Sequence, residues 1–374
     1  MKKSNSMYLL HRVNIKALTW SRDSHGLYDY ESHNVHKRLI QASSPLCIIR
    51  SGTDIQSISI PSELTSMPNF NILCSLDQEK SEFFIKPHDS EPLWQVVRSM
   101  KCQYGSGCIL KEGDIIKLGR VSFKISSLKA LDDKSSNDNT QDSEDIDCDI
   151  PNERETGVCK VCLYDDSEPN NPLISPCKCS GSMKHVHLLC LQKWLASRMV
   201  ARNTENCITY SWKSMECEIC KWTYPFSFCN KGRENDLFSL ERPEAPYLVL
   251  EDIAGDRNNN KAIHVISVTS KNSVKLGRGH DSDVRISDIS VSRCHAIIKL
   301  RDGNFLLEDN ISKFGTLVMS KDKIHIPNNY SVVVQTGRTV ITMSLKNNSS
   351  PFDLGAELDN SLDDENIQIG KRSL

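Results

Sequence analysis

The clearest alternation of apolar and polar residues lies between positions 246 and 346, where short apolar runs are separated by turn residues. The runs are 247–251, 263–268, 274–276, 283–286, 296–300, 305–308, 316–319, 332–335 and 340–345. Asp302-Gly303-Asn304 marks a tight turn between two of them. Many short strands at this spacing predict a β-sandwich for residues 246–346.

A weaker form of this pattern occupies residues 45–128. The runs 114–118 and 121–125 predict two strands around Gly119-Arg120, and 82–86 and 94–98 are further candidates. We therefore expect a β-rich domain at 45–128. Residues 1–44 show no period that predicts an element, and this N-terminal segment stays unassigned.

Polar runs set the remaining boundaries. Between Asp132 and Glu155 ten acidic residues are opposed only by Lys134 and Arg154. Such a stretch cannot bury enough apolar surface to offset its ordering entropy, so we read 129–155 as an acidic disordered linker. The polar segment 347–374 is read as a disordered tail. These breaks isolate a small domain at 156–228.

Composition narrows the class of protein. The chain has 374 residues, a net charge of -2 and 15 cysteines, an odd number. That count in a long chain favours reduced thiols and metal over a secreted disulfide scaffold. No signal peptide is evident, and no apolar run reaches the roughly 18 residues of a membrane span. We expect a soluble cytoplasmic or nuclear protein with no transmembrane segment, and no basic run that would bind nucleic acid.

The domain at 156–228 carries four closely spaced ligand pairs. They are Cys159 with Cys162, Cys177 with Cys179, His187 with Cys190, and Cys217 with Cys220. Eight soft ligands suffice for two tetrahedral zinc ions, and with no open position these ions would be structural. Each such site supplies roughly 10 kcal/mol or more of folding free energy. His185 forms no such pair, and Cys207 and Cys229 lack a close partner, so we assign none of them to metal.

The segment 176–195, PCKCSGSMKHVHLLCLQKWL, followed by Cys217-Glu-Ile-Cys220, resembles a RING-CH (RING-variant) zinc finger. The resemblance implies a small α+β cross-brace. One ion would take Cys159, Cys162, His187 and Cys190, and the other Cys177, Cys179, Cys217 and Cys220. A PHD finger has the same ligand order, but Met215 stands where it usually has tryptophan. The 26-residue gap between Cys190 and Cys217 indicates an insertion after the central helix.

Fingers of this kind act as RING-type E3 ubiquitin transferases, so the resemblance implies ubiquitin and a ubiquitin-conjugating enzyme as partners. Catalysis would proceed by positioning, with no covalent nucleophile on this chain. Val161, Trp194 and Ile219 match the family's docking groove for the conjugating enzyme. The alternative is that these three residues only form the finger's small core.

A second group of residues lies in the C-terminal sandwich. Gly277-Arg278 is followed by Ser290-Val-Ser292-Arg293-Cys-His295 and by Ser312-Lys313-Phe314-Gly315. From 271 to 346 there are twelve Lys and Arg against seven Asp and Glu, an excess of five positive charges. An arginine can clamp phosphate oxygens through two hydrogen bonds, and glycine lets a backbone approach closely.

This pattern resembles a forkhead-associated (FHA) domain, a β-sandwich whose loops bind phosphothreonine peptides. The resemblance implies phosphopeptide contacts by Arg278, Ser292, Arg293 and Lys313, with structural roles for Gly277 and His295. Ser290 falls near the position that reads the third residue after the phosphothreonine. Phe314 replaces the usual asparagine, which puts peptide affinity in question. The alternative is a sandwich that has lost binding.

Residues 110–125 also resemble the closing strands of an FHA-like sandwich. No Ser-x-x-His follows Arg120, so we assign no phosphate site there. The sequence as a whole favours an E3 ubiquitin ligase whose FHA domain recruits phosphothreonine-containing proteins. The alternative is a non-enzymatic, zinc-binding phosphopeptide adaptor.

Overall fold

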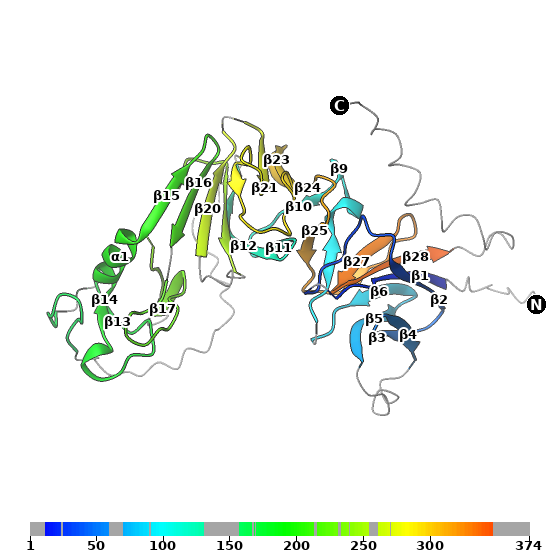
Figure 1. The fold of residues 1–374 in the computed structure, drawn as a ribbon, viewed down its shortest axis with the longest axis horizontal. Coiled ribbons are helices and arrows are strands. Elements are labelled where there is room, and N and C mark those ends of the chain that lie inside the picture. The colour runs from blue at the N-terminus through cyan, green and yellow to red at the C-terminus, as the bar shows by residue number, and fades with distance from the viewer. Residues whose placement is uncertain are drawn as a thin grey trace, which may run out of the picture. The chain divides into compact units, whose positions relative to one another are not determined.

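The computed structural model describes residues 12–23, 25–59, 70–89, 91–130, 157–166, 168, 170–212, 215–230, 233–238, 240–253, 261–269 and 271–346. The predicted tail at 347–374, and all but the first two residues of the predicted acidic linker, lie outside these ranges. The fold is mainly β, as predicted. Within the described ranges α1 (Leu188–Ser197) is the one α-helix (Figure 1).

The chain forms two compact units. The first unit takes Met1–Tyr28, Ser32–Trp94 and Ser320–Leu374, and the second takes Asp29–Glu31 and Gln95–Met319. Each unit therefore draws on segments that are far apart in the sequence.

The first unit is a sandwich of two antiparallel sheets, which we call the first sandwich. Its strands are β1 (Arg12–Trp20), β2 (Val35–Ala42), β3 (Leu46–Ser51), β4 (Asp54–Ile58), β5 (Asn71–Glu79), β6 (Glu82–Lys86), β26 (Ile324–His325), β27 (Val332–Thr336) and β28 (Thr339–Lys346). One sheet has the order β27-β28-β1-β2 and the other β26-β6-β5-β3-β4. Figure 1 shows β1 and β28, from opposite ends of the chain, side by side.

Strand β1 lies in the N-terminal segment to which the sequence assigned no element. Val13, Ile15 and Ala17 point into the core while Asn14 and Lys16 are less buried, which is the two-residue period of a half-buried strand. The period is hard to read because one of its apolar positions is a small alanine. This strand nevertheless has two strand neighbours, β2 and β28.

The second unit contains the second sandwich and the cysteine-rich domain. Its elements are β7 (Trp94–Val96) at the boundary, η2 (Val97–Ser99), β8 (Lys101–Cys102), β9 (Gly105–Ser106), β10 (Cys108–Ile109), β11 (Ile115–Leu118), β12 (Val121–Lys129), β13 (Leu173–Ile174), η3 (Gly181–Met183), β14 (Val186–His187), α1, β15 (Met199–Asn203), β16 (Cys207–Trp212), β17 (Ser227–Asn230), β18 (Arg233–Asp236), β19 (Tyr247–Asp252), β20 (Lys261–Ser267), β21 (Ser273–Gly277), β22 (Val284–Arg285), β23 (Ala296–Arg301), β24 (Asn304–Asp309) and β25 (Thr316–Met319).

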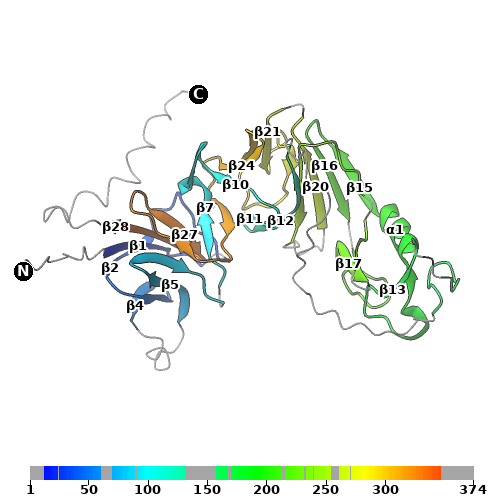
Figure 2. The same ribbon diagram turned by 180° about the vertical axis from the view of Figure 1, so that it is seen from behind.

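The two sheets of the second sandwich repeat the strand order of the first. One runs β20-β19-β12-β11-β25 and the other β10-β24-β23-β21-β22. Strand β12 pairs with β19 and β11 pairs with β25, so strands near position 120 close a sheet made mostly of residues after 246 (Figure 2). In the first sandwich β27 and β28 occupy the corresponding places. The two sandwiches have thus exchanged their closing strands.

This exchange corrects the domain boundaries drawn from sequence at 45–128 and 246–346. The strands predicted at 114–118 and 121–125 are present as β11 and β12, and the one predicted at 94–98 ends at Val96, but the strands divide between the units at 94/95 and 319/320. Alternating polarity identifies a strand locally, whereas its partner depends on packing across hundreds of residues. Buried Ile116, Leu118 and Phe123 complete the core of the second sandwich.

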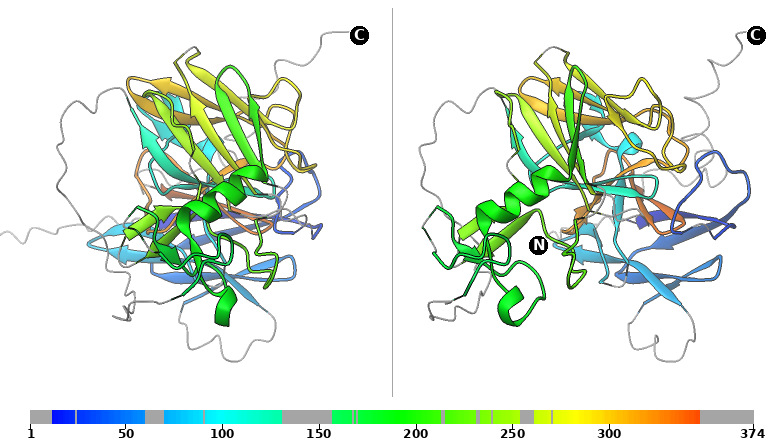
Figure 3. Two further views of the ribbon diagram at one scale, coloured as in Figure 1. Left: turned by 90° about the vertical axis from the view of Figure 1, so that its left-hand side faces the viewer. Right: turned by 60° about the vertical axis from the view of Figure 1, so that its left-hand side comes forward.

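The expected insertion after the central helix is the hairpin β15–β16. Strand β16 pairs along its whole length with β20, which extends a sheet of the second sandwich (Figure 3). Trp212 at the end of β16 packs against Phe238 with ring centroids 4.4 Å apart, and the core beneath includes residues of α1 and of β19 and β20. The hairpin therefore attaches the cysteine-rich domain to the sandwich through a continuous sheet and a shared core.

Candidate zinc centres and phosphopeptide-binding loops

The eight predicted metal ligands gather in two clusters. Cys159, Cys162, His187 and Cys190 form the first cluster, and Cys177, Cys179, Cys217 and Cys220 form the second. Within each cluster the ligand atoms lie within 4.8 Å of one another. The first and third pairs share one cluster and the second and fourth pairs the other, which is the interleaving of a cross-brace.

The geometry of the first cluster suits a tetrahedral metal. His187 Nδ1 lies 3.2 Å from Cys162 Sγ and 4.0 Å from Cys190 Sγ. Ligands on one zinc ion are separated by about 3.5–3.8 Å, as the Zn–N and Zn–S bond lengths require. Nε2 of His187 is 2.5 Å from the carbonyl oxygen of Asp166. A proton on Nε2 would donate to that carbonyl and leave Nδ1 free to bind metal.

Backbone N–H groups point at one sulfur in each cluster. The N–H groups of Val161 and His187 each lie 3.4 Å from Cys159 Sγ. Burial opposes ionisation of Cys159, but the N–H groups outweigh it and lower the pKa of this thiol to about 6. Burial likewise opposes ionisation of Cys217, and backbone N–H groups with the Tyr224 hydroxyl lower its pKa to about 6. Thiolates are the form that binds zinc.

The same local turn builds both of these sulfur sites. The N–H of Leu163 donates to the carbonyl of Cys159, and the N–H of Lys221 donates to the carbonyl of Cys217, each at 2.9 Å. Leu163 and Lys221 both have positive φ, 65° and 58°. Such φ values are uncommon outside glycine and mark positions held by their surroundings.

In the second cluster the sulfurs of Cys179 and Cys217 are 3.6 Å apart. The Lys160 ammonium lies 3.5 Å from Cys177 Sγ and 3.8 Å from Cys217 Sγ. Burial alone would lower the pKa of Lys160, but the neighbouring thiolates outweigh it and raise this pKa. The Lys160 ammonium thus occupies one side of the second cluster and interacts favourably with its sulfur atoms. The donor sets of both clusters fit zinc.

The residues excluded from metal binding lie elsewhere. His185 is buried with Nδ1 3.3 Å from the Ser175 hydroxyl, and it belongs to neither cluster. Cys207 is buried in β16, where burial raises the pKa of its thiol to about 12. Cys229 lies exposed on β17.

The predicted phosphate-binding loops converge at one end of the second sandwich. The backbone N–H of Arg278 donates to the carbonyl of Ser292 at 2.9 Å, and its side chain is exposed. A Cβ at Gly277 would stand 2.2 Å from the carbonyl oxygen of Arg293, so no larger residue fits there. Arg293 itself is exposed beside it.

His295 ties these loops to the next one. Its buried ring accepts the Ser292 N–H at Nδ1 (3.1 Å), and Nε2 donates to the Gly315 carbonyl (3.1 Å). The Ser292 hydroxyl in turn accepts the N–H of Lys313 at 3.3 Å. Burial lowers the pKa of His295, which favours the neutral ring that this bonding requires.

Two families match these regions. The RING-variant domain matches residues 159–220, and the FHA domain matches residues 274–340. The chain contains a RING-variant domain and an FHA domain. The residues of the FHA match divide between the units, since β21 to β25 lie in the second sandwich and the residues after Met319 lie in the first.

Curated relatives share a fifth of this chain. The chain is 34% identical over 73 residues to the E3 ubiquitin-protein ligase MARCHF7 of Mus musculus (20% of this chain, 10% of the relative). It is 36% identical over 78 residues to the ERAD-associated E3 ubiquitin-protein ligase DOA10 of Saccharomyces cerevisiae (21% and 5%). It is 41% identical over 76 residues to the probable E3 ubiquitin ligase SUD1 of Arabidopsis thaliana (20% and 5%). The chain thus spans a tenth or less of each relative's length.

One solved chain that resembles this protein comes from a structural and functional analysis of phosphothreonine-dependent FHA domain interactions. It is 19% identical and covers 26% of this chain and 94% of that chain, with a TM-score of 0.13. Among the described residues of the present chain, no helix has the length and apolar character of a membrane span.

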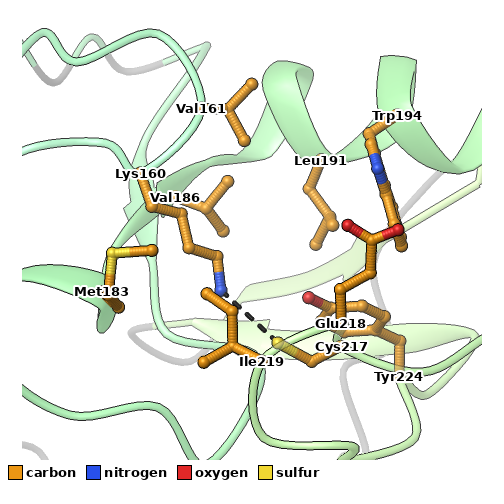
Figure 4. A pocket seen from close by; sticks show the side chains of 10 residues that line it. All are labelled: Lys160, Val161, Met183, Val186, Leu191, Trp194, Cys217, Glu218, Ile219 and Tyr224. Atoms are coloured by element: carbon orange, nitrogen blue, oxygen red, sulfur yellow. Dashed lines mark hydrogen bonds between the residues drawn. The ribbon is translucent and has the colours of Figure 1, made fainter.

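The three residues predicted to contact a conjugating enzyme line one groove of the RING-variant domain. Val161 comes from the first cysteine loop, Trp194 from α1, and Ile219 from the last cysteine loop (Figure 4). The groove has a volume of about 140 Å³. Val161 and Ile219 are half exposed, whereas Trp194 packs edge-on against Tyr224 with centroids 6.2 Å apart. The groove is thus open and mostly apolar, with an aromatic wall, and Lys160 and Glu218 add one charge of each sign to its lining.

Two features of the FHA loops were not foreseen. Ser290 is buried, because Gly119 and Arg120 of the β11–β12 turn cover it and the Arg120 N–H donates to its hydroxyl at 2.9 Å. The side chain left in solvent is that of Ile289, 81% exposed. Lys313 is paired with acidic residues from near position 30. The residues that cover Ser290 and those that pair with Lys313 lie far away in the sequence, so no local sequence pattern predicts these contacts.

Proposed function

We propose that this protein is a RING-type E3 ubiquitin ligase whose FHA domain recruits phosphothreonine-containing partners. The groove lined by Val161, Trp194 and Ile219 carries the proposal, because it lies directly against the cysteine loops and is shaped for a small transient interface. Support also comes from curated relatives that are named as E3 ubiquitin ligases. The compartment we propose is cytoplasmic or nuclear, where cysteine clusters stay reduced.

The ligand clusters would hold two structural zinc ions, one in each. Zinc there would supply rigidity, since each ion has four protein ligands and no position for substrate. The chain's own contribution would be to hold a ubiquitin-charged conjugating enzyme against the groove beside a substrate lysine. Metal analysis of carefully purified protein should give two zinc ions per chain. A value near zero would refute the assignment of a zinc finger.

The β15–β16 hairpin would connect the site that recruits a phosphoprotein to the site that promotes ubiquitin transfer. Because β16 continues the sheet of the second sandwich, the groove and the phosphate-binding loops belong to one packed unit. A bound phosphoprotein would then be presented at a restricted distance from the conjugating enzyme, which raises the effective concentration of its lysines.

A ubiquitination assay with a panel of conjugating enzymes tests the ligase activity. Ile219→Ala should reduce ubiquitin transfer at least about tenfold, the loss of a modest hot spot. Val200→Ala is the matched control, since Val200 is an exposed apolar residue of β15 outside the groove. Trp194→Ala should also lose activity while zinc content is retained. If wild-type protein with both zinc ions transfers ubiquitin with no enzyme of the panel, the adaptor function is favoured.

A phosphothreonine peptide library tests the reader. We expect binding of phosphorylated peptides and none of their unphosphorylated counterparts. Exposed Arg278 beside Ser292 supports this expectation, because no carboxylate of the described residues pairs with its guanidinium, which can therefore bind phosphate. Equal binding of both peptide forms would refute the assignment.

A further inference from the structure

An acidic segment from the N-terminal half, Asp29–Glu31, lies against the loop that borders the phosphate-binding residues. We call residues 312–315 the rim loop. The backbone N–H of Tyr30 donates to the Lys313 carbonyl at 3.0 Å. The Tyr30 ring covers Gly315, where a Cβ would stand 2.7 Å from the ring and where φ is +74°. The segment groups with the second unit, apart from its own sequence neighbours.

Arg98 holds this arrangement together. Its guanidinium lies over the Tyr30 ring, 4.3 Å from the centroid. It also donates to the Ser312 carbonyl at 2.6 Å and pairs with Asp309 at 2.9 Å. One cation thus clamps the tyrosine, the rim loop and the end of β24, so the acidic segment is a fixed part of the surface.

The segment reverses the charge of the rim. Lys313 Nζ lies 3.3 Å from a carboxylate oxygen of Asp29 and 4.0 Å from one of Glu31. Lys313 alone would make the rim positive, whereas the two carboxylates leave it with one net negative charge. The Glu31 side chain is 66% exposed, so this charge faces solvent.

The rim is contiguous with the phosphate-binding loops. The Lys313 N–H donates to the Ser292 hydroxyl, and His295 connects the Ser292 N–H to the Gly315 carbonyl. Because the Lys313 N–H contacts Ser292 and the Lys313 ammonium pairs with Asp29 and Glu31, a single residue links the acidic segment to the predicted phosphate-binding serine.

We propose that Asp29 and Glu31 determine the peptide specificity of the FHA domain, selecting phosphothreonine peptides with a lysine or arginine beside the phosphothreonine and rejecting those with acidic flanks. The proposal rests on the proposed function of this domain as a phosphothreonine reader. Lys313, which the family resemblance assigns to the peptide, is instead neutralised by the segment.

The test uses full-length, zinc-loaded protein and phosphothreonine peptides in which each flanking position is fixed as Lys, Arg, Asp or Glu. Wild-type protein should favour a basic residue over an acidic one by about threefold or more at one or more positions, which is the scale of one unit charge in a mostly aqueous setting. The preference should shrink in 0.5 M salt, because exposed charges are screened.

Charge variants separate this specificity from mere structure. Glu31→Gln should reduce the basic preference, Glu31→Lys should invert it, and Asp29→Asn combined with Glu31→Gln should give an acidic preference through the freed Lys313. Glu205→Gln is the matched control, since Glu205 is another exposed acid of the second unit and pairs with Lys271. An acidic preference in wild type, or an unchanged preference in Glu31→Lys, would overturn the proposal. No phosphorylation-dependent binding by wild type or variants would instead refute the reader function.

Discussion

The two sandwiches share a strand order but treat a comparable arginine in opposite ways. In the first sandwich Arg50, near the end of β3, is 9% exposed, donates to the Thr339 hydroxyl at 3.0 Å and lies 3.6 Å from the Glu91 carboxylate. In the second sandwich Arg278, directly after the equivalent strand β21, is exposed, and its Nε donates to the Val291 carbonyl at 3.3 Å. The Arg50 side chain is therefore bound within the fold, whereas the Arg278 side chain is accessible to a ligand.

The loops around each arginine explain the difference. In the second sandwich the His295 ring joins the loop of Ser292 to the rim loop, the Arg278 backbone N–H donates to the Ser292 carbonyl, and the Arg278 side chain is exposed. In the first sandwich Asn71 opens β5, and its side-chain amide donates to Glu91 at 2.8 Å. Glu91 is thus held between the Arg50 guanidinium and the Asn71 amide, so that Arg50 is committed to an ion pair within the fold. Function thus resides in the loops, and the fold alone does not confer it.

The exchange of closing strands can be tested with one residue type in the two sandwiches. Ile125 of β12 and Ile341 of β28 are both fully buried, the former in the second sandwich and the latter in the first. Substitution of either by alanine should cost about 2–5 kcal/mol. Hydrogen exchange should show Ile125→Ala destabilising β23 and β24, and Ile341→Ala destabilising β5 and β6.

If each sandwich were built from consecutive strands of the sequence, the two substitutions would have the opposite effects, so the experiment distinguishes the two arrangements. If β28 closed the FHA sandwich, Ile341→Ala would loosen β23 and β24 and weaken phosphothreonine binding, and Ile125→Ala would not. A fragment of residues 246–346 would also be a complete domain in that case. In the exchanged fold this fragment lacks β10, β11 and β12.

The exchange also marks how far the sequence could predict this protein. The metal ligands were predictable because cysteines at fixed spacing on tight turns form local clips, and all nine strands expected after position 246 were found. The partner of each strand was not predictable, since β12 and β28 have similar apolar alternation and either could pair with β19. The burial of Ser290 and the neutralisation of Lys313 depend on Arg120 and Asp29, whose sequence positions give no hint of this contact.

Acid should separate the sandwiches further, because only the second holds buried histidines among the described residues. His264 is buried in β20, with Nδ1 2.9 Å from the Thr209 hydroxyl. Burial lowers the pKa of His264 from 6.5 to about 4. The unfolded chain therefore takes up the proton first, and the stability is complete above about pH 6.5 and lost as pH falls toward 4. The loss is about 3 kcal/mol over that window.

Hydrogen exchange at pH 7.5 and pH 5 would measure this loss, with intrinsic rates corrected for pH. Protection of β19, β20 and β12 should fall more than protection of β1 and β5. His264→Asn is the matched variant, since zinc release in acid affects it equally while the imidazole is gone. Equal acid sensitivity of wild type and His264→Asn would show that another group controls the transition.

The two arginines provide the smallest and most direct contrast. Arg50→Ala removes a charged hydrogen bond to Thr339 and leaves Glu91 half-paired, which should cost the first sandwich about 2 kcal/mol. Phosphothreonine binding should be unchanged, because the Arg50 side chain is buried in the first sandwich and does not face a ligand. Arg278→Ala should change the free energy of unfolding by no more than about 0.5 kcal/mol, as expected for an exposed side chain, and should abolish phosphothreonine binding. Calorimetry and peptide titration on the same two proteins measure both quantities. Loss of phosphothreonine binding in Arg50→Ala would mean that the first sandwich also contributes to binding. The conclusion that only the second sandwich binds the peptide would then be wrong.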